Sequence, residues 1–245
     1  MQRKSLFNSP PASPPPSSPR HPCFPLSPRF PLSLIFPLSP CFPLSPRFPL
    51  SPSPPIRPMI ANPQRLTPGE YLALESQSSV KHEYLNGLVL AMAGTTDSHN
   101  TIALNLAMAM GAQLRGTGCR IYFAEVKARL EECNCFYYPD LFVTCDLRDQ
   151  ETAHYKRFPK LIIEVLSDST EAFDRGDKFR DYRTLPSLEE YVLVSTKTPQ
   201  VEVFRRTESD LWLLQAYGAG ESLALESIEL SIPIAEIYTD VNLNP

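Results

Sequence analysis

A glutamate lies inside an uninterrupted apolar run in the second half of the chain, and this run restricts the possible folds more than any other feature. The run covers residues 161–166 (LIIEVL), and its length and composition predict a strand that is covered on both faces. Burying an ionised carboxylate there is costly unless a cation or hydrogen-bond donors compensate for it. Glu164 therefore requires a metal ion, a lysine or an arginine close by.

A second acid stands in a similar setting earlier in the chain. Asp140 follows Tyr138-Pro139 and precedes the apolar residues 141–143, 24 residues before Glu164. Two carboxylates in such surroundings favour a metal ion over a single basic side chain as the compensating charge.

The first 58 residues have a composition unlike that of the rest. They hold 19 of the 27 prolines and no acidic residue, and the tetrapeptide FPLS recurs every six residues from Phe24 to Ser51. We therefore predict a disordered or extended tail over 1–58 and a folded domain over 59–245. The tail resembles a polyproline ligand or a transit peptide, but we favour an expanded repeat read from an upstream start, with Met59 as the native start. Because proline interrupts each apolar stretch of the tail, we expect neither a signal peptide nor a membrane helix there.

Charge and cysteine content limit the possible partners. Without the six basic residues of the tail, 17 basic residues face 27 acidic ones, a net charge of −10 over 59–245. A general phosphate-binding surface is therefore not expected, although a divalent ion can offset the field locally. Cys119, Cys133, Cys135 and Cys145 can in principle form a zinc site, but they lack the usual paired spacing. We predict free thiols in a reducing cytoplasm.

In the folded part, the order of the expected helices and strands predicts a mixed sheet with helices on its faces, which is an α/β fold. Residues 81–93 predict a hairpin with its turn at Asn86-Gly87. Apolar spacing predicts helices at 67–74, 97–114 and 174–185. The remaining runs predict strands at 120–123, 126–130, 136–144, 161–166, 190–194, 201–205 and 211–216.

A lysine on the last predicted helix is the natural partner of the buried glutamate. Phe179, Tyr182 and Leu185 mark the buried stripe of this helix, and Lys178 lies on the edge of the same face. Its stem can reach Glu164 on the preceding strand. The alternative is an exposed i,i+4 ion pair between Asp174 and Lys178.

Asp140, Glu164 and Lys178 together supply what metal-assisted phosphodiester hydrolysis needs. The carboxylates can hold a divalent cation, and the lysine can orient water or neutralise developing charge. Hard oxygen ligands favour Mg²⁺ or Mn²⁺ over zinc. The alternative for the acids is a structural ion-pair network with basic neighbours, namely Lys160, Arg175 or Arg180.

These motifs, in this order, resemble one known family. Residues 139–140 (PD), 163–170 (IEVLSDST) and 174–178 (DRGDK), followed by Tyr182, are similar to the Uma-type "putative restriction endonuclease" family, a mainly bacterial branch of the PD-(D/E)XK nuclease superfamily. The similarity runs from about Leu66 to Ile237 and includes Glu83 with Gly87, and His99. One departure is Asp168, which stands where the family usually has proline and brings another charge toward the expected site.

The resemblance implies a restriction-endonuclease-like α/β/α core and a cytoplasmic, divalent-metal-dependent DNA endonuclease. It implies that Asp140 and Glu164 are metal ligands and that Glu83 is an additional acid near the metal. It also implies that Lys178 is the catalytic lysine, moved to the helix because Leu166 occupies the usual lysine position. Cleavage of both DNA strands would favour a homodimer.

Several alternatives stay open from the sequence. His99 can contact a phosphate or the metal-bound water, or it can be a hydrogen-bonded cap residue of its helix. The protein can also be a catalytically inactive descendant, a nucleic-acid or protein-binding module that keeps the acids for structure. A two-carboxylate glycosidase is disfavoured, because Trp212 is the only tryptophan and that chemistry does not require the lysine.

Overall fold

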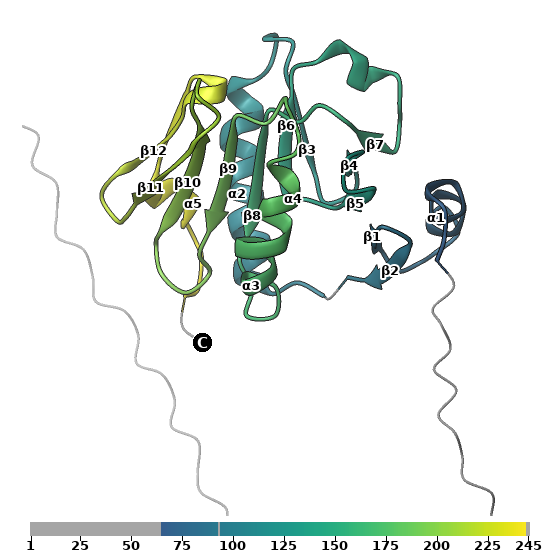
Figure 1. Ribbon diagram of the computed structural model, residues 1–245. Coiled ribbons are helices and arrows are strands. Elements are labelled where there is room, and N and C mark those ends of the chain that lie inside the picture. Colours follow the sequence, from purple (N-terminus) through teal and green to yellow (C-terminus); the bar gives the residue numbers. More distant parts are fainter. Residues whose placement is uncertain (1–64, 93, 244–245) are drawn as a thin grey trace, which may run out of the picture. The chain divides into compact units, whose positions relative to one another are not determined.

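The computed structural model describes residues 65–92 and 94–243 (Figure 1). The predictions for the tail, residues 1–58, lie outside the described residues. Within the described ranges, no helix combines the length and the apolar character that crossing a bilayer requires.

The described part begins with a short helix and a hairpin. Helix α1 (Pro68–Glu75) starts at a capping box, in which the Thr67 side chain accepts the Glu70 N–H and the Glu70 carboxylate accepts the Thr67 N–H. Strands β1 (His82–Leu85) and β2 (Leu88–Ala91) pair antiparallel around the predicted turn. Asn86 and Gly87 both have positive φ there, as a tight hairpin turn requires.

A larger sheet of six strands, counted over the described residues, forms the centre of the fold. Its order is β11-β10-β9-β8-β6-β3, with β8 parallel to β9 and the other neighbours antiparallel. The strands are β3 (Arg120–Phe123), β6 (Leu141–Thr144), β8 (Leu161–Val165), β9 (Glu190–Val194), β10 (Val201–Arg206) and β11 (Trp212–Tyr217). Each residue of β8 is buried, which confirms the predicted strand covered on both faces.

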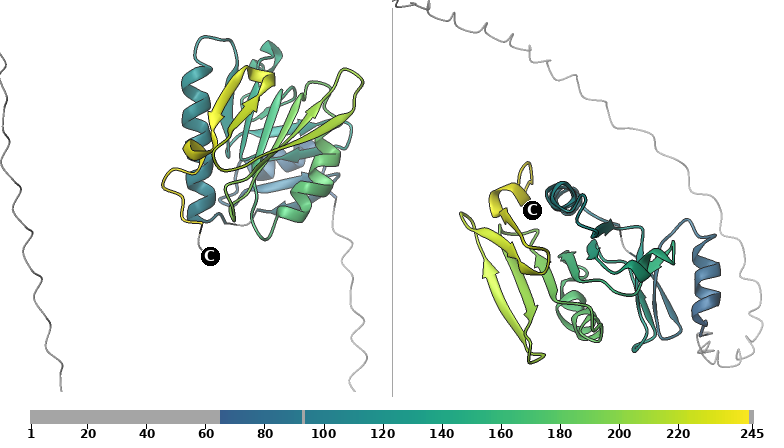
Figure 2. Two further views of the ribbon diagram at one scale, coloured as in Figure 1. Left: turned by 90° about the vertical axis from the view of Figure 1, so that its left-hand side faces the viewer. Right: turned by 90° about the horizontal axis from the view of Figure 1, so that it is seen from above.

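Helices cover both faces of the larger sheet, and this confirms the predicted α/β/α architecture (Figure 2). On one face lies α2 (Asp97–Gln113), whose buried Ile102, Leu106 and Met110 pack against alternate residues of β6, β8 and β9. On the other face lies a helical segment made of α3 (Glu171–Phe173), η2 (Asp174–Lys178) and α4 (Phe179–Tyr182). Tyr182 and Leu185 pack there against the opposite residues of the strands.

The remaining strands form two further sheets. In the described part of the chain, a smaller sheet of five strands has the order β2-β1-β5-β4-β7, with β4 (Lys127–Leu130), β5 (Cys135–Tyr137) and β7 (Tyr155–Lys156). Near the C-terminus, β12 (Ser222–Leu225) pairs with β13 (Leu230–Pro233). Short helices complete the chain: η1 (Leu147–Gln150), η3 (Glu226–Ile228) and α5 (Ile234–Ile237).

Two predicted elements differ from the structure. The strand predicted over 136–144 is two strands, β5 and β6, which belong to different sheets and are separated by Tyr138-Pro139-Asp140. Proline has no N–H to donate to a ladder, which accounts for the break. The helix predicted over 174–185 begins at Glu171 and ends at Tyr182, and its middle turn, η2, is a π-helix.

The prediction of free thiols is wrong for two of the four cysteines among the described residues. Cys119 and Cys145 form a disulfide, because β3 and β6 pair antiparallel with Arg120 opposite Thr144, which brings the residue just before β3 opposite the residue just after β6. Cys133 and Cys135 are free. The disulfide also removes two members of the four-cysteine zinc set.

Candidate active site

Glu164 lies near the end of β8 and is nearly enclosed, with 2 % of its surface exposed. Its Oε1 accepts a hydrogen bond from the Tyr182 hydroxyl at 2.9 Å and one from Lys178 Nζ at 3.2 Å. Its Oε2 accepts the Asp140 N–H at 3.2 Å. Lys178 and two hydrogen-bond donors therefore stabilise this buried carboxylate, as the sequence requires.

Lys178 ends the π-helical turn and points into a cluster of acids. Its Nζ lies 3.2 Å from Glu83 Oε1, 3.2 Å from Glu164 Oε1 and 3.3 Å from Asp174 Oδ1. The Asp174–Lys178 pair of the alternative interpretation exists, but both side chains are buried, so it is no surface ion pair. Single π turns within helices are frequent at functional sites, and this one holds both residues toward β8.

Asp140 and Glu164 interlock through the backbone where β6 begins and β8 ends. The Asp140 N–H donates to Glu164, and in return Asp140 Oδ2 accepts the Val165 N–H at 2.8 Å. His99 Nε2, near the start of α2, lies 3.1 Å from the same Oδ2. The Asp140 side chain keeps 22 % of its surface exposed, so it is the acid of this group with the most access to solvent.

Glu83 reaches the cluster from the smaller sheet. It lies on β1, and its Oε1 accepts the Tyr138 N–H at 3.3 Å in addition to its contact with Lys178. The structure thus brings Glu83, Asp140, Glu164 and Lys178 into one group, with His99 beside it.

Burial and the neighbouring charges shift the pKa values of Glu164 and Lys178. Burial raises the pKa of Glu164 well above its usual range, opposed by Lys178 and assisted by the charges of Asp174, Asp140 and Glu83. Burial alone would lower the pKa of Lys178, but the four acids outweigh it and raise that pKa well above its usual range. Lys178 is therefore charged.

Two members of the site carry a role that the sequence did not assign to them. Asp174 is 2 % exposed, and its Oδ1 accepts no hydrogen bond within the described residues, although Lys178 lies beside it. Tyr182, predicted as a core residue, also donates its hydroxyl to Glu164. The i,i+4 spacing from Lys178 was a signal for both, since residues four apart share a helix face.

The donor set fits a divalent cation. Four carboxylates face one lysine ammonium, and even a protonated His99 would leave the cluster negative if each acid were ionised. Excess buried charge of this kind is costly without a cation. Asp140, the most exposed acid, together with Glu164 and Glu83, supplies the hard oxygen ligands that Mg²⁺ and Mn²⁺ prefer.

The basic residues that were the alternative partners of Asp140 and Glu164 form ion pairs with other acids. Lys160 pairs with Glu189, Arg175 pairs with Glu171 and Glu202, and Arg180 pairs with Asp177 and Asp181. Asp168, the departure from the family pattern, is a surface residue that pairs with Lys197 at 2.9 Å.

A mixed sheet flanked by helices, with paired acids at the meeting ends of two central strands and a helix lysine in contact with one of them, defines a protein of the restriction-endonuclease-like class. The family model described as "Uma2: Putative restriction endonuclease" matches residues 68–235. The chain belongs to this family.

The chain is also similar to individual proteins and to a solved structure. The chain is 37 % identical over 174 residues to the uncharacterized protein slr1290 of Synechocystis sp., covering 71 % of this chain and 92 % of that protein. It is 30 % identical over 171 residues to the uncharacterized protein sll1609 of the same organism, covering 69 % and 96 %. A crystal structure described as a putative nuclease belonging to DUF820, from Anabaena variabilis, matches with a TM-score of 0.61 and 16 % identity, over 72 % of this chain and 99 % of the other. That likeness supports the fold.

Proposed function

We propose that this protein is an endonuclease that hydrolyses phosphodiester bonds of DNA and depends on Mg²⁺ or Mn²⁺. The observation that carries the proposal is the buried contact of Lys178 with Glu164 and Glu83, beside an Asp140 that is interlocked with Glu164. The family description, "Putative restriction endonuclease", supports the same reaction.

Asp140 and Glu164 are the proposed metal ligands, with Glu83 as an additional acid. When bound, a divalent cation polarises the phosphate and lowers the pKa of a water molecule that it holds. The chain prepares this position in advance: the Val165 N–H fixes Asp140, and the Tyr182 hydroxyl fixes Glu164. Such preorganisation removes the need to reorder ligands during the reaction.

Lys178 is the proposed catalytic lysine. Its Nζ is charged, lies next to the acids and can donate hydrogen bonds to the attacking water or to a phosphate oxygen on which charge develops. His99 contacts the Asp140 carboxylate and is the proposed positioning residue for it. The backbone N–H of His99 also donates to the cap residue Thr96, and contact of His99 with a phosphate or a metal-bound water remains part of the proposal.

A DNA substrate implies the cytoplasm as the working compartment. Cleavage of both strands of a duplex by a chain with one such site implies a homodimer, because a two-fold axis relates the strands. Light scattering of the purified chain, with and without duplex DNA, measures whether this dimer exists.

The decisive experiment compares a substitution of a proposed metal ligand with a matched substitution of an exposed acid nearby. Glu164→Gln keeps the size of the side chain but removes a proposed metal ligand, whereas Asp177→Asn changes an exposed acid next to Lys178 that pairs with Arg180. We expect Glu164→Gln to abolish Mg²⁺-dependent nicking of a plasmid and to weaken Mg²⁺ binding in calorimetry, and Asp177→Asn to retain both. Equal activity of Glu164→Gln and the parent chain would refute the proposal. A parent chain that shows neither cleavage nor a metal-dependent thermal shift would identify the inactive binding module instead.

A further inference from the structure

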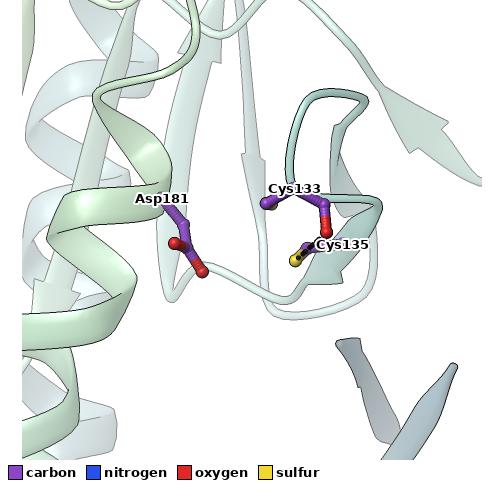
Figure 3. A group of neighbouring side chains, drawn as sticks. All are labelled: Cys133, Cys135 and Asp181. Carbon is purple, nitrogen blue, oxygen red and sulfur yellow. Dashed lines mark hydrogen bonds between the residues drawn. The ribbon is translucent and has the colours of Figure 1, made fainter. Parts of the chain in front are cut away.

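A second group of possible metal ligands lies where the β4–β5 hairpin meets helix α4. Cys133 is in the turn between β4 and β5, Cys135 is the first residue of β5, and Asp181 projects from α4 toward them (Figure 3). One ligand atom from each of these residues lies within 4.8 Å of the others. Cys135 is buried, Cys133 is partly buried, and Asp181 is 9 % exposed.

The two thiols are poorly satisfied by hydrogen bonds. Cys135 Sγ lies 3.1 Å from the Cys133 carbonyl oxygen, and Cys133 Sγ lies 3.9 Å from the Leu130 carbonyl oxygen. A thiol is a weak donor, so these contacts contribute little. A hydrogen bond between the thiols lowers the pKa of Cys135 and raises that of Cys133.

Asp181, in contrast, is held firmly in place. Its Oδ2 accepts the Tyr137 hydroxyl at 2.7 Å, and its Oδ1 accepts a hydrogen bond from Arg180 Nε at 3.2 Å. Outer hydrogen bonds of this kind orient a carboxylate that binds a metal and favour its ionised form. The nearby guanidinium also offsets part of the negative charge that two thiolates and a carboxylate would bring.

We propose that Cys133, Cys135 and Asp181 form a zinc site that is separate from the proposed active site. Thiolate sulfur selects Zn²⁺ over Mg²⁺, and a water molecule would complete the tetrahedron. With Zn–S bonds of about 2.3 Å, the sulfur atoms of a tetrahedral site lie about 3.8 Å apart, so side-chain rotation over about 1 Å brings this group into position. The two thiols release their protons to solvent when the ion binds.

Such a zinc ion would tie the β4–β5 hairpin of the smaller sheet to the helix that carries the lysine. Asp181 lies one turn beyond Lys178, and the ring of Tyr137, whose hydroxyl binds Asp181, lies 5.7 Å from Lys178 Nζ. Zinc would therefore stabilise the position of Lys178 without contacting substrate. This role is structural, and zinc binding itself does not depend on whether the protein cleaves DNA.

The test uses the full chain with Cys23→Ser and Cys41→Ser, so that tail thiols do not bind metal. The parent of this series is stripped with a chelator and titrated with Zn²⁺, and separately with Co²⁺, in excess Mg²⁺. We expect one equivalent of Zn²⁺ by calorimetry and a thiolate-to-Co²⁺ charge-transfer absorption. Cys135→Ser should remove the absorption and weaken Zn²⁺ binding by at least about 100-fold, the upper range for loss of an outer hydrogen bond alone.

Matched variants separate this site from the other acids. Asp181→Asn should weaken Zn²⁺ binding, whereas Asp177→Asn, on the same helical segment but exposed, should not. Glu164→Gln should keep the thiolate absorption and the zinc equivalent, whatever its effect on DNA cleavage. A parent chain without thiolate absorption, or unchanged Zn²⁺ binding in both Cys135→Ser and Asp181→Asn, overturns the proposal. If Cys135→Ser does not fold by circular dichroism, the Asp181→Asn spectrum alone decides.

Discussion

Replacing Lys178 by methionine would remove the only cation that contacts Glu83, Glu164 and Asp174 among the described residues. Lys178 is 6 % exposed, so water cannot take the place of its ammonium. Removing one partner of a buried ion pair costs about 3–5 kcal/mol, because the remaining charge is left uncompensated. Since burial already raises the pKa of Glu164, this acid can take up a proton and relieve part of the cost. We therefore expect the lower part of this range, about 3 kcal/mol.

A loss of about 3 kcal/mol is a large part of the 5–15 kcal/mol by which a domain is usually stable. For a folded region of this size it corresponds to a fall in Tm of roughly 6–12 °C. The assay is urea and thermal unfolding without divalent metal, with Asp177→Asn as the control of unchanged stability. Mg²⁺ should restore part of the loss in Lys178→Met, because a bound cation would compensate the same acids. A variant as stable as the parent in the absence of Mg²⁺ would refute the view that Lys178 neutralises this cluster.

Three further predictions test separate parts of the structure. Tyr182→Phe removes the hydroxyl donor to Glu164 but keeps the ring, and should lower the free energy of unfolding by about 1.5–3 kcal/mol in denaturant titrations, as for a lost hydrogen bond to a charged group. Leu106→Ala, fully buried between α2 and the larger sheet, should cost about 2–5 kcal/mol in the same titrations, whereas Met108→Ala, 58 % exposed, should change stability by less than about 0.5 kcal/mol. His99→Ala should reduce plasmid cleavage by about 10–100-fold at nearly unchanged Tm, since it removes an outer contact to a proposed metal ligand; equal cleavage by variant and parent would exclude a positioning role.

The parts of the site that could be predicted are those that follow from local pattern. The charge of Glu164 inside an apolar run required a partner, and the helix face of Lys178 pointed to the strand that carries it. The spacing of Asp174 was equally visible, but whether an i,i+4 pair is buried depends on the sheet beneath it. The π turn that holds both residues has no signature in apolar periodicity.

Long-range pairing explains what the sequence could not provide. Residues 136–144 are predicted as one strand, yet they form two strands on either side of Pro139, and the partners of each half decide to which sheet it belongs. Cys119 and Cys145 are 26 residues apart, and their meeting follows from the register of β3 and β6. The same register separates them from Cys133 and Cys135, so the four cysteines do not act as a set. Pairing between distant strands is set by packing, which periodicity does not record.

The break at Tyr138-Pro139-Asp140 leaves the acids of the site divided between two sheets. Glu83 belongs to the smaller sheet, whereas Glu164 belongs to the larger one. Lys178 forms an ion pair with both acids. A change in the angle between the two sheets would therefore alter the distance from Lys178 to one of these acids. Lys178 therefore joins the two sheets through one acid of each.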